Sequence, residues 1–226
     1  LAMLTTDYGD NPEFDNRQRE QTLRAVIGYD HLRSSWRVGA KAGYVYSWMA
    51  YDYKRDPGNG IMTDMTRSRS NINTVFAQAD GEYHLSDKWL FTANVAAHQH
   101  FVVSKDKNII LQQGGTGIVG YDKARIELSG VVSAKYRPVE RFGMALTLRE
   151  EMFGTEFTPI IPALFLDGVL SKRGNIILKA SVSRNYRFPT LNDRYFLPGG
   201  NPDLRPEKGF TYDAELSFKV GKAERY

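Results

Sequence analysis

The chain of 226 residues contains no cysteine. That absence excludes a disulfide framework and a thiolate metal site. Long hydrophobic runs are missing as well, because no apolar segment approaches the roughly 18 residues that a membrane-spanning helix requires. A helical membrane protein is therefore excluded. A transmembrane β-barrel is not excluded, since only alternate residues of its strands meet lipid, and a mean hydropathy of −0.44 suits that arrangement.

The sequence also lacks a strong excess of one charge. Lys and Arg number 30 against 26 Asp and Glu, and they are spread evenly along the chain. No basic cluster with interleaved aromatic residues indicates a nucleic-acid partner. No G-x-S-x-G, HExxH, P-loop or other catalytic motif is present, so we predict that the protein is not an enzyme. An apolar content of 42% excludes a disordered chain.

What the chain has instead is a two-residue period over most of its length. Alternation of apolar with polar residues is typical of β-strands that have one buried face. Eight segments show it clearly: 23–30, 36–48, 75–85, 89–101, 123–136, 142–152, 176–186 and 210–218. Two further strands are expected at 1–6 and 162–170. The pattern predicts an all-β, antiparallel fold.

The apolar face of these strands almost excludes charge. Only Glu150 and Arg184 are charged on that face, whereas charged residues are frequent on the opposite face. A lipid-facing surface explains this asymmetry, because Lys or Arg at mid-bilayer costs about 2–4 kcal/mol, falling toward the interfaces. Both exceptions lie near the long-loop ends of their strands, where the penalty is expected to be small. The paired carboxylates of Glu150 and Glu151 cannot form an acid–base dyad, since adjacent strand residues point to opposite faces.

Aromatic residues mark both expected membrane interfaces. One set flanks the short connections: Trp36, Tyr83, Trp89, Tyr136 and Phe142. The other set lies toward the long connections: Tyr46, Trp48, Phe101 and Tyr121. A strand from the first to the second set spans roughly 28 Å when tilted by about 45°. Two aromatic girdles at that separation are typical of an outer-membrane barrel.

Connection lengths alternate along the chain. Short turns are expected at 31–35, 86–88, 138–141 and 171–175. Long loops are expected at 7–18, 52–70, 102–120, 154–161 and 188–206. Up-and-down strands with short periplasmic turns and long extracellular loops give this rhythm, whereas a soluble sandwich has no reason to place every long loop at one end.

Residues 184–207 read RNYRFPTLNDRYFLPGGNPDLRPE. This segment, here called the signature segment, resembles the RxPTLNDxY…GGNPDLxPE signature of TonB-dependent outer-membrane receptors. The matching residues are Pro189, Thr190, Leu191, Asn192, Asp193, Gly199, Gly200, Asn201, Pro202, Asp203, Leu204, Pro206 and Glu207. The resemblance implies an active transport receptor in the outer membrane of a Gram-negative bacterium. It implies a scarce nutrient as cargo: cobalamin, slightly preferred, or a ferric siderophore or haem.

The resemblance also implies a larger whole. Receptors of this kind close at about 22 strands around a plugged lumen, and about ten strands are visible here. Residues 1–226 are therefore expected to be part of the barrel domain, with the plug domain and the final strands absent. The implied partners are outer-membrane lipid and the TonB energy-transducing complex, the latter through the plug. A surface lipoprotein is a further candidate partner.

The signature segment has two interpretations. Its prolines and paired glycines fix or bend the backbone, which predicts a rigid loop packed against neighbouring loops or strand ends and an architectural role. The alternative is that Asn192, Arg194 and Tyr195 contact cargo. Arg194 stands where the family often has a hydrophobic residue, so that position is a candidate for specificity.

Other polar residues are weaker candidates for a site. His98 and His100 are expected side by side on the inward face and could share a metal ion or a haem iron, but the sequence offers no third ligand, and no cofactor is predicted. The inward face also carries charged residues: Lys123, Arg125, Glu127, Arg149 and Glu151. The resemblance implies that such a wall holds the plug.

Two other classes of protein fit the strand pattern. A self-contained ten-stranded outer-membrane protein, such as an adhesin or a surface protease, requires the first and last strands to pair. A soluble β-sandwich binding module requires two stacked layers, with Trp36, Phe91 and Leu128 buried between them.

Overall fold

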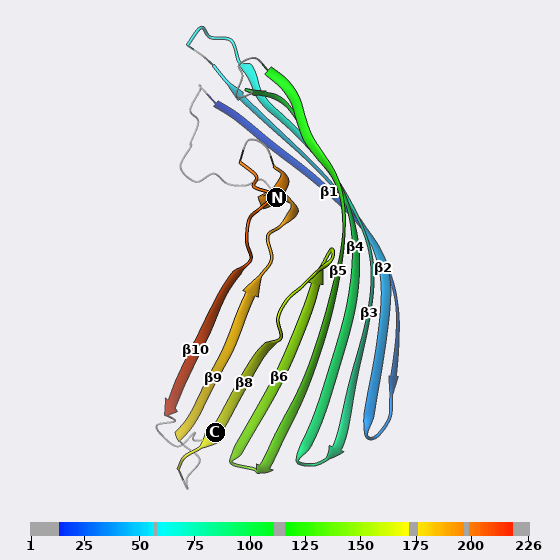
Figure 1. The fold of residues 1–226 in the computed structure, drawn as a ribbon, viewed down its shortest axis with the longest axis vertical. Helices are drawn as coiled ribbons and strands as arrows, with labels where there is room; N and C mark the ends of the chain where they lie inside the picture. The colour runs from blue at the N-terminus through cyan, green and yellow to red at the C-terminus, as the bar shows by residue number, and fades with distance from the viewer. Residues whose placement is uncertain (1–13, 57, 111–115, 172–175, 197–198, 219–226) are drawn as a thin grey trace, which may run out of the picture.

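The computed structural model describes residues 14–56, 58–110, 116–171, 176–196 and 199–218. They form one antiparallel sheet in the order β1-β2-β3-β4-β5-β6-β8-β9-β10, with the short β7 paired to β6. Figure 1 shows this sheet curving around a concave side. The elements are β1 (Phe14–Leu32), β2 (Trp36–Arg55), β3 (Thr63–Ser86), β4 (Trp89–Ile110), β5 (Thr116–Val139), β6 (Phe142–Phe153), β7 (Glu156–Phe157), β8 (Ile161–Val169), β9 (Ile176–Arg187), α1 (Leu191–Tyr195) and β10 (Glu207–Phe218).

All the clearly predicted strands are present, and the prediction at 162–170 is confirmed as β8. The prediction at 1–6 lies outside the described residues. Each strand is joined to the next in simple up-and-down order, so the all-β, antiparallel prediction is confirmed. The short turns predicted between β1 and β2, β3 and β4, and β5 and β6 are confirmed as well.

Two of the predicted long loops are wrong, and the described end of a third, 14–18, belongs to β1. Most of 52–70 belongs to β2 and β3, and most of 102–120 belongs to β4 and β5. The strand pairs continue there, as in the partnership of Asp52 with Arg67. Above the membrane the outward face no longer has to be apolar, so the hydrophobic alternation ends while backbone hydrogen bonding continues.

The sheet has no conventional hydrophobic core. Among the described residues the buried hydrophobic side chains other than proline are Ala50, Val102, Ile161 and Phe188. Trp36, Phe91 and Leu128, by contrast, are each more than a third exposed. No second layer covers them, so the β-sandwich prediction is wrong for this part of the chain. In the described sheet β1 and β10 are the two edges and do not pair with each other. The first strand that the closed ten-stranded alternative requires, at 1–6, lies outside the described residues.

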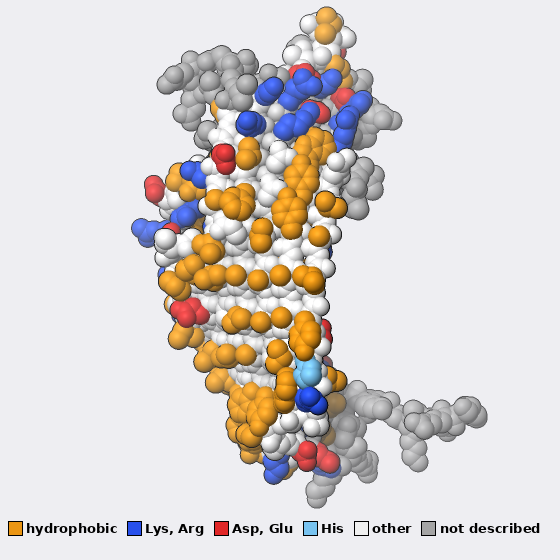
Figure 2. All heavy atoms as spheres, turned by 90° about the vertical axis from the view of Figure 1, so that its right-hand side faces the viewer, with side chains coloured by type: hydrophobic (Ala, Val, Ile, Leu, Met, Phe, Trp, Pro, Cys, Tyr) orange, Lys and Arg blue, Asp and Glu red, His pale blue; other side chains and the backbone are white. Residues whose placement is uncertain are grey.

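The exposed apolar side chains share one face. Cross-strand register places Trp36 beside Tyr83, and Tyr83 beside Phe91. Figure 2 shows such side chains in rows over the convex side of the sheet. An apolar surface of this extent marks contact with a protein or a membrane, and the alternation through all strands fits a lipid-facing wall. Among the described residues no helix is long and apolar enough to cross a membrane.

Both aromatic girdles are present, with one correction. Near the short turns, the ring of Trp89 stacks on that of Tyr136, their centroids 4.2 Å apart. Toward the opposite end, the Tyr46 hydroxyl donates to Asn71 Oδ1 at 3.0 Å, which gives an interfacial tyrosine the polar partner it needs. Tyr121 does not belong to this outer girdle. It lies on the inward face, where it contacts the signature segment.

Candidate functional site

The signature segment folds back onto the concave, luminal face of the sheet (Figure 1). Its helix α1 lies against β5. The Tyr121 hydroxyl donates to Asn192 Oδ1 at 2.6 Å, and Arg125 Nη1 donates to the Pro189 carbonyl at 3.0 Å. Phe188 and Pro189 are both buried. The predicted packing of this segment against its neighbours is therefore observed, and the surface it packs on is the inner wall of β5.

Helix α1 was not predicted from the sequence. Thr190 caps it: the backbone N–H of Asp193 donates to the Thr190 hydroxyl at 3.1 Å, and the Thr190 N–H donates to Asp193 Oδ2 at 2.8 Å. This reciprocal capping box satisfies two backbone donors that a helix start would leave unpaired. The same backbone hydrogen bond from Thr190, helped by the contact with its side chain, holds the pKa of Asp193 below its usual value. The Thr-x-x-Asp spacing was the signal in the sequence that could have revealed the helix.

The turn after α1 closes on the helix. The N–H of Gly200 donates to the Phe196 carbonyl, and the N–H of Asn201 donates to the Asp193 carbonyl at 2.9 Å. A Cβ at Gly200 would lie 2.5 Å from the Phe196 carbonyl oxygen, whereas a Cβ at Gly199 would meet nothing within 4 Å. Only the second glycine of the pair is therefore required by close backbone approach.

Cations and aromatic rings alternate around this contact. Lys123 Nζ lies 4.7 Å from the centre of the Tyr195 ring. The Arg194 guanidinium lies 5.2 Å from the centre of the Phe188 ring and within 3.6 Å of Glu156 Oε1 on β7. The ring of Phe188 in turn stacks on that of Phe153, at 4.9 Å. Cation–π contacts of this kind gain strength where water is excluded.

Two luminal hollows flank the docked segment. The larger, of about 510 Å³, lies between α1 and the wall made by β2 to β5; its polar lining includes Ser70, Thr74, His100, Tyr121, Arg125, Glu127 and Asn192. The smaller, of about 410 Å³, is lined by residues that include Tyr121, Lys123, Arg194 and Tyr195. The structure thus brings the predicted residues Asn192, Arg194 and Tyr195 to the luminal side, where each also contacts the wall or a neighbouring strand. Their contact with cargo remains a prediction.

The two histidines face the lumen as predicted. Their rings are stacked, with centroids 5.9 Å apart. His100 Nδ1 is 2.9 Å from the Thr74 hydroxyl, and its Nε2 is 3.6 Å from Glu127 Oε2. Both nitrogens of His100 thus have protein neighbours. In the part of the chain that the structure describes, no group of three or more His, Cys, Asp or Glu residues could hold a metal ion.

The rest of the inner wall is rich in ion pairs. Arg125 pairs with Glu127, and Arg37 bridges Asp30 and Asp80, with its nearest approach to Asp30 at 2.6 Å. Glu150 and Glu151 lie on opposite faces: Glu150 pairs with Gly130 in the outward register and Glu151 with Ser129 in the inward one. The prediction that they form no dyad is confirmed. The expectation that Glu150 lies near the membrane interface is wrong, because its neighbour Gly130 pairs with Val95 near the middle of the apolar band.

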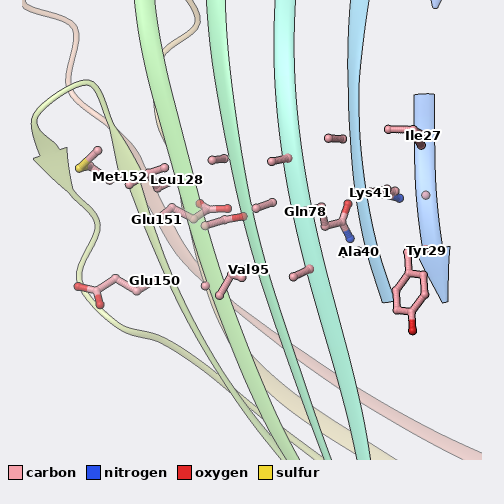
Figure 3. Close-up of a pocket in the computed structure, with 18 of the residues that line it drawn as sticks. Ile27, Tyr29, Ala40, Lys41, Gln78, Val95, Leu128, Glu150, Glu151 and Met152 are labelled. Atoms are coloured by element: carbon pink, nitrogen blue, oxygen red, sulfur yellow. The ribbon is translucent and has the colours of Figure 1, made fainter. Parts of the chain in front are cut away.

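A further hollow, of about 1020 Å³, is not part of this site. It lies over a patch of small residues on β2, β3 and β4, among them Ala40 and Ala79, with the larger side chains of Tyr29, Leu128 and Glu150 at its margins (Figure 3). The register places these residues on the apolar, outward face. Lipid therefore fills it in a membrane.

A family model described as "TonB dependent receptor-like, beta-barrel" matches residues 3–223. The chain belongs to this family. The TonB-dependent receptor barrel is the fold that the signature segment predicted, and it places the chain in the outer membrane of a Gram-negative bacterium.

Solved structures show the same fold at low sequence identity. The "Copper transporter OprC" is 14% identical, with a TM-score of 0.68 over 93% of this chain and 38% of that chain. The structure titled "Structure of the RagAB peptide importer in the 'closed-closed' state" is 14% identical, with a TM-score of 0.53 over 91% of this chain and 28% of that chain. The chain thus spans well under half the length of either barrel protein. A comparison with curated proteins gives no match.

Proposed function

We propose that the chain forms part of the wall of an active nutrient importer, in a barrel of about 22 strands. Extracellular loops would capture cargo, and the TonB complex would act on a plug domain inside the barrel to open a passage. The observation that carries this proposal is the docking of the signature segment on the charged luminal wall, through the contacts of Asn192 with Tyr121 and of Pro189 with Arg125. This function is transport and requires no catalysis by the chain.

The proposed cargo is cobalamin or an iron chelate, meaning a ferric siderophore or haem. The signature segment motivates this choice. The two luminal hollows support it, because they combine cations such as Lys123 with aromatic rings such as Tyr195. Large conjugated ligands that carry carboxylate, phosphate or catecholate groups match such a lining. A plug held by the inner ion pairs and a surface lipoprotein over the loops complete the proposed assembly.

Uptake assays in cells that carry the whole receptor test the cargo. Labelled cobalamin, ferric siderophores and haem are compared with copper ions and short peptides. Energy-dependent uptake of one of the first three supports the proposal, and uptake of copper or peptides alone contradicts it. Lys123→Gln combined with Tyr195→Leu is expected to weaken cargo binding about tenfold or more, since the two residues contribute a charge and an aromatic face.

Lys41→Gln is the matched control for the loss of charge. Lys41 also lies on the luminal face, opposite Gln78 on β3 and remote in register from the signature segment. Equal losses in both variants would show that a general luminal charge, and not the docked segment, determines binding.

A further inference from the structure

Beyond the outer girdle, the outward face of the sheet changes from apolar to cationic. Figure 2 shows Lys and Arg side chains gathered at this end of the molecule, past the apolar rows. The register resolves them into two consecutive rows on the outward face: Arg17, Asp52, Arg67 and Lys107 in one, and Arg19, Ala50, Arg69 and Lys105 in the other. These six basic residues, on β1, β3 and β4, are called here the cationic band.

The first row of the cationic band, with Arg19, Arg69 and Lys105, lies at the depth of lipid headgroups, and the second row lies about 7 Å further along the strands. Ala50 is two residues beyond Trp48 on β2, and Asp52 is two residues further. Each such step is about 7 Å along a strand. The headgroup layer on one side of a bilayer is about 5–7 Å thick. A charged group one row past the last girdle residue is therefore placed at the phosphates of the outer leaflet.

The charges of the band are only partly balanced within the protein. Arg67 approaches Asp64 from the next row, Nη1 to Oδ2 at 3.6 Å. Asp52 is the single carboxylate in the two rows; Arg69 Nη2 lies 2.7 Å from its Oδ1, and Arg67 Nε lies 3.6 Å from the same atom. Burial by itself raises the pKa of Asp52, but the hydrogen bond from Arg69 and the nearby charges lower it overall. This carboxylate is therefore charged at neutral pH and holds two guanidinium groups together.

Of the remaining cations, Arg17 pairs with Asp15, Nε to Oδ1 at 3.2 Å, whereas the other three face solvent. Arg19, Lys105 and Lys107 are exposed, and within the described residues none of them forms an ion pair. Arg69 lies directly opposite Lys105 across the β3–β4 ladder, and Arg67 directly opposite Lys107. Like charges directly opposite each other destabilise a sheet. An anion bound between the strands removes that repulsion.

We propose that the cationic band binds the phosphate groups of a phosphorylated glycolipid of the outer leaflet, namely lipid A. Its acyl chains lie along the apolar outward face below the band. Arg and Lys are the side chains that bind phosphate best, Arg through a fork that engages two oxygens at once. The site is separate from the luminal hollows, because it occupies the opposite face of the same strands.

The test is a titration of the whole receptor, purified in detergent, with diphosphoryl lipid A, followed by native mass spectrometry. Each cation near an anionic lipid surface is expected to contribute about fivefold in affinity, so that Lys105→Gln combined with Lys107→Gln weakens binding about 30-fold. The matched control is Arg24→Gln combined with Lys41→Gln, which removes two cations from the luminal face of the neighbouring β1 and β2 and is expected to leave binding unchanged.

A variant that is expected to bind lipid A more tightly separates an effect on binding from a folding defect. Asp52→Asn removes the carboxylate of the band, and tighter binding by about fivefold is expected. A folding defect cannot imitate that gain. Wild-type affinity in the Lys105 and Lys107 variant, unchanged or weaker binding by Asp52→Asn, or equal binding of dephosphorylated lipid A would each overturn the proposal. Equal binding of phosphatidylglycerol would overturn the choice of a glycolipid.

Discussion

Gly199 and Gly200 are adjacent, yet the structure gives them different roles. Only Gly200 is in close contact with the helix end, because its own N–H bonds to the Phe196 carbonyl and leaves no room for a Cβ. Asn201 then reaches back to the Asp193 carbonyl. The sequence shows a pair of glycines, but only the three-dimensional contact tells which one a larger residue cannot replace.

Replacing Gly200 by Ala is expected to lower the free energy of opening this turn by about 1–3 kcal/mol, the usual cost of forcing a methyl group into a packed site. Hydrogen exchange at the amide of Asn201 measures it, since that amide is bonded only while the turn is closed. Gly199→Ala is the control and should exchange at the wild-type rate. Equal exchange in both variants would contradict the steric argument.

Asp193 makes the capping box sensitive to acid. Its pKa is lowered because the Thr190 N–H donates to the carboxylate, with a further contribution from the Thr190 side chain. A lowered folded-state pKa means that the contribution to stability is complete above the unfolded value of about 3.9 and is lost as pH falls through the folded pKa. We expect the carboxyl resonance of Asp193 to titrate below about 3.9. Thr190→Val should move the midpoint upward, and an unshifted midpoint in the wild type would refute this account.

At the scale of the strand, successive side chains face two different environments. Val95 on β4 points outward, and its register neighbours on that face are Ala79 and Gly130. Asn94, the preceding residue, points inward opposite Asp80. The first side chain meets lipid and the second meets the lumen, so the same substitution has different consequences one residue apart.

Val95→Arg is expected to destabilise the folded barrel in lipid vesicles by about 2–4 kcal/mol, because the position is near the middle of the apolar band. Asn94→Arg should change stability by much less, since the lumen is polar and Asp80 is near. Denaturant unfolding of the whole receptor in vesicles, followed by tryptophan fluorescence, compares the two. Similar losses in both variants would argue against lipid on the convex face.

At the scale of the whole molecule, the signature segment joins parts of the chain that are far apart in sequence. Tyr121 and Asn192 are separated by 71 residues and meet through a 2.6 Å hydrogen bond. That contact connects the helix before β10 to the luminal face of β5. It also determines which side of the barrel wall the signature segment occupies.

A double-mutant cycle with Tyr121→Phe and Asn192→Ala should give a coupling free energy of about 0.5–1.5 kcal/mol, the range for a hydrogen bond between neutral groups. Protection of the amides in α1 from hydrogen exchange provides the readout. The pair Tyr44 and Asn73 is the matched control: it has the same chemistry on the outward face, and its removal should not affect α1. Additive effects of Tyr121→Phe and Asn192→Ala would mean that the contact does not hold the segment in place.

The sequence alone determined the strands, their order and the face that meets lipid. Local alternation carries that information, because hydrocarbon accepts Trp36 or Leu128 and penalises charge wherever the strand lies. The residues that indicate the family are also close together in sequence, in the signature segment. The predictions of loops at 52–70 and 102–120 are wrong because charged residues on the outward face end the apolar pattern beyond the membrane, while strand pairing continues.

Only the tertiary structure decided which distant residues share a site. Along the chain, charge is spread evenly, and neither Arg69 nor Lys105 stands out. Strand register brings them opposite each other on the outward face and, with their neighbours, makes a cationic band. In the same way, the sequence places Tyr121 in the outer girdle, whereas the structure shows that its partner is Asn192 in the signature segment. Register and loop docking depend on contacts between segments many residues apart, and no local pattern encodes such contacts.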